Sequence, residues 1–131
     1  MHISNIQLGK NVQIEIDSNV NNIKIGDNTR IANRVKIFGS ETDILEIGKN
    51  SYVGLNSFIE GFNSKVVIGD HTWIGGNSII MPAVTLGKYC VVAANSFVNK
   101  SFPDYTIIGG TPAKLIRTLT PSEIETLHSN D

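Results

Sequence analysis

The feature that most constrains this chain is the recurrence of an aliphatic residue at every sixth position. With that residue as position one, the recurrences are Leu8 and Ile14, then Ile25, Ile31 and Ile37, then Ile47, Val53 and Ile59, and finally Ile68, Ile74, Ile80, Leu86, Val92 and Val98. Position five is small or β-branched, as in Val12, Ser18, Thr29, Val35, Ser51, Ser57, Thr72, Ser78, Val84, Cys90 and Ser96. A short repeat of this kind predicts a solenoid.

The period has a simple geometric meaning. Because a strand rises about 3.3 Å per residue, six residues supply one flat side and one corner. The aliphatic residue points inward, and the small residue at position five fits where a narrow coil has little room. Gly is frequent at position two and Asn at position four, where Asn tolerates the left-handed backbone region. Three repeats close one triangular coil, so the sequence predicts an all-β parallel β-helix and disfavours an antiparallel sandwich, which would alternate with period two.

Two insertions interrupt the repeat. The steps from Ile37 to Ile47 and from Ile59 to Ile68 exceed six residues, by four and by three. Both insertions follow the third side of a coil. We therefore expect two loops stacked on one corner, which is where a solenoid carries binding sites.

We expect a single domain with four parts. These are an irregular first coil over residues 1–22, the β-helix over 23–100, an extended tail over 101–118, and a short helix with the terminus over 119–131. The helix is predicted by Thr120 as N-cap, Pro121 at the first helical position, and Glu123, which completes a capping box.

Composition narrows the function classes. The 131 residues include 11 basic and 12 acidic ones, and a net charge of −1 gives no general attraction to nucleic acid or anionic membranes. No apolar run approaches the roughly 20 residues that span a bilayer. The first ten residues lack the pattern of a secretory signal. The only cysteine, Cys90, falls on a position-five core site, so we expect a buried thiol in a cytoplasmic protein.

Residues 67–117 resemble the hexapeptide acyltransferases, which include maltose, galactoside and xenobiotic O-acetyltransferases. The matching segments are residues 67–76 (VIGDHTWIGG), 80–87 (IMPAVTLG), 91–100 (VVAANSFVNK) and 108–114 (IGGTPAK). The resemblance implies a left-handed β-helix, a homotrimer, and acetyl-CoA as co-substrate in a groove between subunits. It implies acyl transfer to a hydroxyl or amine of a sugar or nucleotide sugar, with no metal and no nucleic-acid or membrane partner.

The resemblance also places the coenzyme. Two pairs of small residues would leave room for the pantetheine arm: Gly75 with Gly76, and Ala93 with Ala94. Three cations of the last coil and tail would suit the nucleotide phosphates: Lys100, Lys114 and Arg117. The alternative for each cation is ordinary surface charge. Trp73 faces outward in the same region, and we expect it to border the coenzyme at the interface between subunits.

The family's catalytic histidine is absent from the loop before residue 67, which reads EGFNSK over residues 60–65. The general base is then His71 or Glu60. His71 occupies a corner slot used elsewhere by Asn, so a turn role is its alternative; Glu60 opens the loop, and a solvated acid is its alternative. Imidazole titrates near neutrality without perturbation, whereas a carboxylate needs burial, which favours His71. Three loop residues would contact the acceptor: Phe62, Asn63 and Ser64.

Two other functions remain open. A non-catalytic binding or assembly protein would explain the missing histidine. A zinc hydratase of the γ-carbonic-anhydrase type would need three histidines, and only His71 lies in the repeats. The remaining two, His2 and His128, lie near the chain ends and are expected in solvent.

Overall fold

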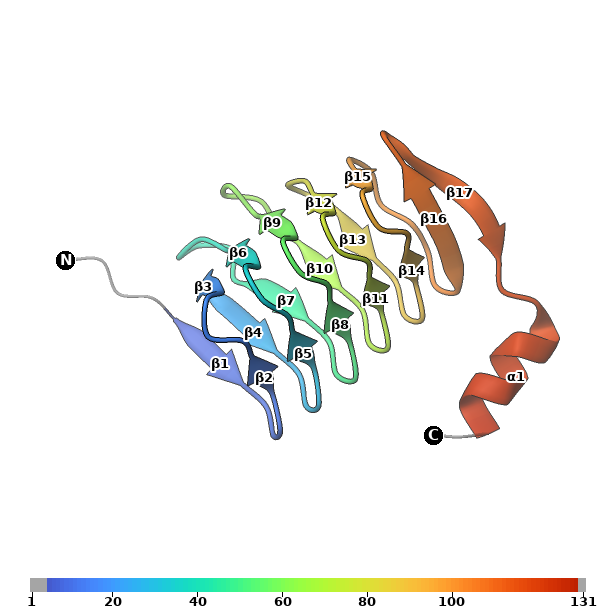
Figure 1. The fold of residues 1–131 in the computed structure, drawn as a ribbon, viewed down its shortest axis with the longest axis horizontal. Coiled ribbons are helices and arrows are strands. Elements are labelled where there is room, and N and C mark those ends of the chain that lie inside the picture. The colour runs from blue at the N-terminus through green and yellow to red at the C-terminus, as the bar shows by residue number, and fades with distance from the viewer. Residues whose placement is uncertain (1–4, 130–131) are drawn as a thin grey trace.

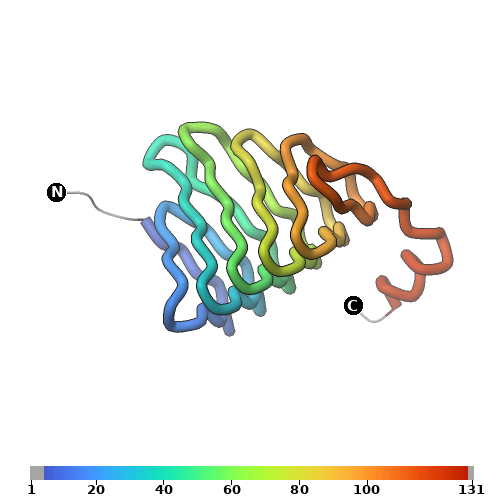
Figure 2. Tube along the Cα trace, turned by 45° about the horizontal axis from the view of Figure 1, so that its top comes forward, coloured from blue at the N-terminus to red at the C-terminus, as the bar shows by residue number. Residues whose placement is uncertain are grey.

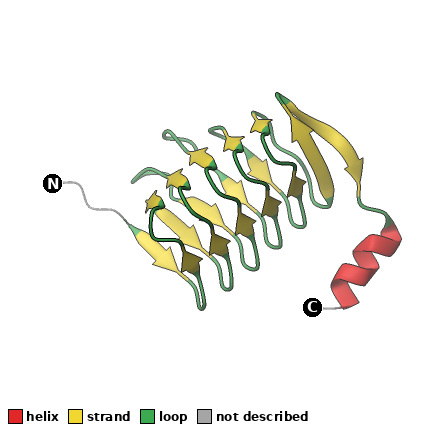
Figure 3. Ribbon diagram, in the orientation of Figure 1, coloured by secondary structure: helices red, strands yellow, loops and turns green. Residues whose placement is uncertain are grey.

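The six-residue period folds into three short strands per coil, and the coils stack into a parallel β-helix (Figures 1 and 3). The computed structural model describes residues 5–129. Sheet A contains β1 (Ile6–Leu8), β4 (Ile23–Ile25), β7 (Leu45–Ile47), β10 (Val67–Ile68) and β13 (Thr85–Leu86). Sheet B contains β2 (Gln13–Ile14), β5 (Arg30–Ile31), β8 (Tyr52–Val53), β11 (Trp73–Ile74), β14 (Val91–Val92), β16 (Thr106–Gly110) and β17 (Ala113–Thr118). Sheet C contains β3 (Asn19–Asn21), β6 (Lys36–Phe38), β9 (Phe58–Glu60), β12 (Ile79–Ile80) and β15 (Phe97–Val98). We name the three edges of the prism the A/B, B/C and C/A corners.

The core is the column of aliphatic side chains predicted at position one. From Ile25 to Val98 these side chains are almost completely buried, and they form one continuous cluster along the axis. Equivalent residues of neighbouring coils pair in register, as Ile31 with Val53 and Ile80 with Val98. Each coil therefore covers the apolar interior of the next, which is how a solenoid removes apolar surface from water.

The first coil is more regular than the sequence suggested. Its three strands pair in register with β4, β5 and β6, and Val20 faces Ile37 at the position-one slot of β3. Val20 lies six residues after Ile14 and so keeps the period, whereas the step from Val20 to Ile25 is five positions and breaks it. Ile6 and Leu8 remain about half exposed, since no coil of the described chain covers them.

Buried hydroxyls at position five link successive coils. At the A/B corner, the Ser51 hydroxyl donates to the Gly69 carbonyl at 3.1 Å and accepts the Thr72 N–H at 3.1 Å. At the B/C corner, the Ser78 hydroxyl donates to the Ala93 carbonyl and accepts the Ser96 N–H, both at 3.3 Å. Within residues 5–129, every buried side-chain nitrogen or oxygen has a partner. The rule at position five thus has a polar cause as well as a steric one.

The corners use the left-handed backbone region that position four predicted. At the A/B corner the residues with positive φ are Asn11, Asn28, Asn50, His71, Tyr89 and Tyr105, with φ between 55° and 63°. Aspartates at position three fasten alternate coils there: Asp70 Oδ1 accepts the Lys49 N–H at 2.9 Å, and Asp104 Oδ1 accepts the Lys88 N–H at 2.8 Å.

The end of the chain differs from the extended tail that we predicted over 101–118. β16 continues sheet B parallel to β14, and β17 then folds back antiparallel against β16. The predicted helix follows as α1 (Pro121–Ser129), which lies beyond the last coil and turns back toward the coils (Figure 2). The structure describes no helix within residues 5–129 that is long and apolar enough to cross a membrane.

Candidate active site

The two insertions lie side by side at the C/A corner, as the spacing predicted. The first loop joins β6 to β7 and the second joins β9 to β10. The Gly61 N–H donates to the Phe38 carbonyl at 2.8 Å, which ties the start of the second loop to the end of β6, where the first loop begins. A hollow of about 500 Å³ opens between the first loop and its neighbours, and its lining includes Glu41 and Asn63.

Glu60 ends β9 at this corner and faces outward from sheet C. Glu60 pairs with Phe38 of the neighbouring strand β6. Within β9 itself, the preceding residue that faces outward is Phe58. The carboxylate is half-buried, and its Oε1 accepts the Phe62 N–H at 3.3 Å. Apolar side chains continue across the same face, where Ile79 pairs with Phe58. Glu60 is thus a carboxylate at the border of an apolar sheet face and a polar loop.

The three loop residues predicted to contact the acceptor differ in exposure and in backbone conformation. Phe62 is 75% exposed and adopts a φ of 44°, so its ring is presented to solvent from a turn. Asn63 also has positive φ, at 63°, and lines the hollow of the loop corner. The Ser64 N–H closes the turn by donating to the Gly61 carbonyl at 2.9 Å.

His71 lies at a different corner. It follows β10 at the A/B corner, and its ring stacks on that of Tyr89 with centroids 4.5 Å apart and planes 2° apart. Tyr89 stacks in turn on Tyr105, whose hydroxyl lies 2.7 Å from His128 Nε2. The structure therefore does not bring His71 and Glu60 together, because β10 and a full side of the coil separate them. His128 is exposed, as expected, although its ring contacts Tyr105; His2 lies outside the described residues.

The small residues predicted for the coenzyme occupy the B/C corner, where sheet C begins. A methyl group added at Gly75 would lie 2.6 Å from the Ala94 nitrogen, so coil stacking alone demands glycine there. At Gly76 the same addition would meet the Leu55 carbonyl at 3.1 Å, a tight contact. Ala93 and Ala94 continue this column one coil further. The corner is consequently narrow, with only hydrogen or methyl side chains on these four residues.

The remaining predicted coenzyme residues are partly engaged within the chain. Trp73 is 46% exposed on the outward face of sheet B and stacks on Tyr52, with ring centroids 5.8 Å apart. Lys100 Nζ lies 5.5 Å from the centroid of the Phe102 ring. Lys114 is exposed on β17.

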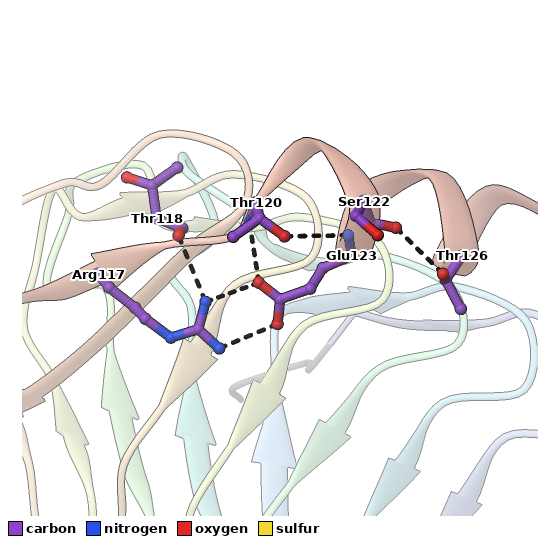
Figure 4. A network of polar contacts seen from close by, with 6 residues as sticks. All are labelled: Arg117, Thr118, Thr120, Ser122, Glu123 and Thr126. Carbon is purple, nitrogen blue, oxygen red and sulfur yellow. Dashed lines mark hydrogen bonds and ion pairs between the residues drawn. The ribbon is translucent and has the colours of Figure 1, made fainter.

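Arg117 is committed to the start of α1 (Figure 4). Its two terminal nitrogens donate to the two Glu123 oxygens at 2.7 and 2.9 Å. The predicted capping box is present, since the Glu123 N–H donates to Thr120 Oγ1 and the Thr120 N–H donates to Glu123 Oε1. Hydrogen bonds from Arg117 lower the pKa of the Glu123 carboxyl to about 2, and Glu123 raises the pKa of Arg117. The sequence located the capping box but not the arginine that closes it.

The sequence also missed the column of rings at the A/B corner. The signal was available, because position four of that corner changes from Asn to aromatic residues toward the end of the chain. Among residues 5–129, no group of three or more His, Cys, Asp or Glu side chains is placed to hold a metal ion.

Comparison with known proteins places this geometry in a class. Residues 65–100 match the family described as bacterial transferase hexapeptide, six repeats. A hexapeptide-repeat-containing acetyltransferase from Vibrio cholerae superposes with a TM-score of 0.79 at 31% identity, covering 87% of this chain and 74% of that one. The same Vibrio cholerae protein has been solved in complex with acetyl coenzyme A. The chain belongs to the hexapeptide-repeat acetyltransferase family.

Curated relatives are longer than this chain. Galactoside O-acetyltransferase of Escherichia coli is 30% identical over 88% of this chain, but that covers 55% of its own length. A mitochondrial γ-carbonic anhydrase of Arabidopsis thaliana is 31% identical over 93% of this chain and 47% of its own length. The chain thus spans about half the length of these relatives, and the second match shows that the repeat alone does not separate the two chemistries.

Proposed function

We propose that this protein transfers an acetyl group from acetyl-CoA to a hydroxyl or amine of a sugar or nucleotide sugar. The observation that carries the proposal is the 31% identity, across 87% of the chain, to an acetyltransferase of known structure. The sugar class is supported by the galactoside specificity in the name of the Escherichia coli relative. We further propose a homotrimer that binds the coenzyme between subunits, in the cytoplasm.

Sheet C is the face that best combines the two halves of such a site. Its strands begin at the B/C corner, where Gly75, Gly76, Ala93 and Ala94 carry only hydrogen or methyl side chains and would border the pantetheine arm. They end at the C/A corner, where Glu60 and the two insertions lie. His71 lies on neither of these corners. This arrangement favours Glu60 over His71 as the general base, against the order that the titration of a free imidazole suggested.

In the proposed reaction, the Glu60 carboxylate accepts the proton of the acceptor hydroxyl or ammonium. The freed oxygen or nitrogen attacks the thioester carbonyl, the carbon–sulfur bond breaks, and the coenzyme thiolate leaves and takes up a proton. Phe62, Asn63 and Ser64 border the acceptor, and Trp73 lies at the subunit interface. Lys114 contacts a coenzyme phosphate from the exposed strand β17, where Arg117 contributes less because Glu123 already holds its guanidinium.

The test of the base is a pair of conservative variants assayed by release of the coenzyme thiol with galactosides and amino sugars. Glu60→Gln keeps the size of the side chain, and we expect kcat to fall by roughly 10²–10⁴ with little change in coenzyme affinity. His71→Asn is the matched control, because Asn28 and Asn50 occupy the same corner slot with φ of 60° and 55°. Loss of activity in His71→Asn alone would overturn the assignment to Glu60. A wild-type protein that binds acetyl-CoA yet acylates no acceptor would instead favour a non-catalytic role.

The coenzyme contact has its own measurement. We expect Lys114→Glu to weaken binding of CoA more than binding of dephospho-CoA, because a phosphate contact matters only when the phosphate is present. Equal losses for the two ligands would remove the phosphate role. Light scattering in the presence of CoA tests the trimer, and a stable monomer that binds CoA would contradict it.

A further inference from the structure

The helix α1 is attached to the β-helix mainly at its two ends. At its N-terminal end Glu123 forms the two-pronged ion pair with Arg117 of β17 (Figure 4). At its C-terminal end the His128 ring contacts Tyr105 through the 2.7 Å hydrogen bond and meets the edge of Tyr89 at 5.2 Å. α1 is described in full, and none of its residues is buried. The helix is therefore held in place without packing a core of its own.

A hollow of about 420 Å³ lies between these two attachments. Its lining comprises His71, Tyr89, Val91, Leu119, Ser122, Glu123, Thr126 and Leu127. Val91, Leu119 and Leu127 give it apolar walls, while His71, Ser122 and Thr126 supply polar groups. Its volume falls within the range of roughly 300–1,000 Å³ that is typical of small-molecule sites.

One wall of the hollow is rigid and aromatic. The rings of His71 and Tyr89 are stacked in parallel planes, and Tyr89 is only 8% exposed. Tyr105 continues the stack on the far side of Tyr89, at 5.4 Å. Such a column cannot collapse into the hollow, because each ring is held by its neighbours and by the coil spacing. An aromatic ligand can meet it in offset or edge-to-face contact, the arrangements that aromatic pairs prefer.

The charge of the lining also restricts the ligand. Glu123 is the one carboxylate among the lining residues, and both of its oxygens are held by Arg117. Because this ion pair neutralises the Glu123 carboxylate, the hollow offers no unpaired charge from that residue to a charged ligand.

We propose that this hollow binds a compact, uncharged aromatic ring that carries a hydrogen-bonding group. None of the residues that line the hollow, other than His71, is among those proposed for acetyl transfer, whose reacting groups lie on sheet C and its two corners. α1 forms the outer wall, the ring column forms the inner wall, and the polar side chains of His71, Ser122 or Thr126 orient the ligand.

The experiment uses indole as the probe, with saturation-transfer NMR on the full chain and Leu127→Trp as the variant that fills the hollow. We expect the wild type to bind indole and Leu127→Trp to lose at least about tenfold in affinity, because the new side chain occupies the ligand's place. Glu125→Trp is the matched control, since it adds the same ring to an exposed position of α1 outside the lining. Ring-current shifts should appear at the methyl groups of Val91 and Leu127.

The outcomes separate this proposal from its competitors. Indole binding that is equal in wild type and Leu127→Trp, or no binding to the wild type, would overturn it. A change of oligomeric mass in Leu127→Trp without any indole binding would show that a second copy of the chain fills the hollow instead. Acetyl transfer should be unchanged in Leu127→Trp, so failure here and failure of the proposed enzyme activity are distinguishable.

Discussion

Ser78 offers a quantitative test of how the coils are held together. It is completely buried at position five of the B/C corner, between Ser57 of the preceding coil and Ser96 of the next. Its own N–H donates to Ser57 Oγ at 3.4 Å, and its hydroxyl bonds both Ala93 and Ser96. Three substitutions separate the two functions of this side chain. Ala removes the hydroxyl, Thr keeps it and adds a methyl group, and Leu removes it while adding bulk.

The expected magnitudes follow from the contacts. Ser78→Ala leaves the buried Ser96 N–H without that acceptor, and the 3.3 Å distance puts the cost at about 1–2 kcal/mol. Ser78→Thr costs about 1 kcal/mol, since only one methyl group must be accommodated. Ser78→Leu combines the lost hydrogen bonds with overpacking in a side chain that has no exposed surface, about 2–5 kcal/mol. Leu should therefore be the most damaging change, although it is the most hydrophobic.

Thermal unfolding followed by circular dichroism is a suitable assay. For a chain of this size, 1 kcal/mol corresponds to roughly 3–5 °C in Tm, so Leu lowers Tm by roughly 6–25 °C and Ala by roughly 3–10 °C. Ser129→Leu is the control, because Ser129 is exposed at the end of α1. A Ser78→Leu protein that melts within about 2 °C of the wild type would refute the idea that position five is both tight and hydrogen-bonded.

Two further predictions concern a corner and the helix. Asn50 has a φ of 55°, a conformation that a Cβ without a polar side chain disfavours. Asn50→Ala should therefore lower the free energy of unfolding in urea by about 1 kcal/mol, while Asn50→Gly stays near the wild type. Equal stability of the two variants would contradict this steric explanation. The pKa of Glu123 is lowered from 4.5 to about 2, so its contribution to holding α1 is present above pH 4.5 and is lost as the pH falls toward 2. Protection factors of the α1 amides, which correct the exchange rates for the intrinsic effect of pH, should fall over that interval in the wild type, and in Glu123→Gln they should already be low at neutral pH.

Most of the β-helix could be predicted from the sequence because its period is a geometric requirement. A side chain every sixth residue must point inward if three sides close a coil, and positive φ at position four follows from the corner. The exceptions are local departures from that period. Val20 keeps the period after Ile14 but was missed because the next step, to Ile25, is one residue short. The β16–β17 hairpin was missed because antiparallel pairing leaves no six-residue signature.

The candidate site was less predictable, because it depends on which residues of different corners lie along the same side of the β-helix. The insertion lengths placed the loop corner correctly, and they placed Glu60 at its edge. The spacing placed His71 in the same corner slot as Asn28, Asn50 and Tyr89, but it did not show that this corner lies away from Glu60 or that Arg117 is held by Glu123 six residues later. Such pairings arise from the turn between β17 and α1, which has no repeat to constrain it.

The column at the A/B corner gives a structural reason for the presence of His71. The first three coils carry Asn at position four, whereas Tyr89 and Tyr105 occupy it in the last two. At this slot, aromatic rings occur only in the coils that α1 approaches. His71 is the first of these rings along the chain, and it lines the hollow together with Leu127 of the helix. Stacking against Tyr89 and a wall for α1 account for an aromatic residue at this slot without any catalytic duty. We therefore propose that the base of the reaction lies at another corner, with Glu60 at the edge of sheet C as the candidate.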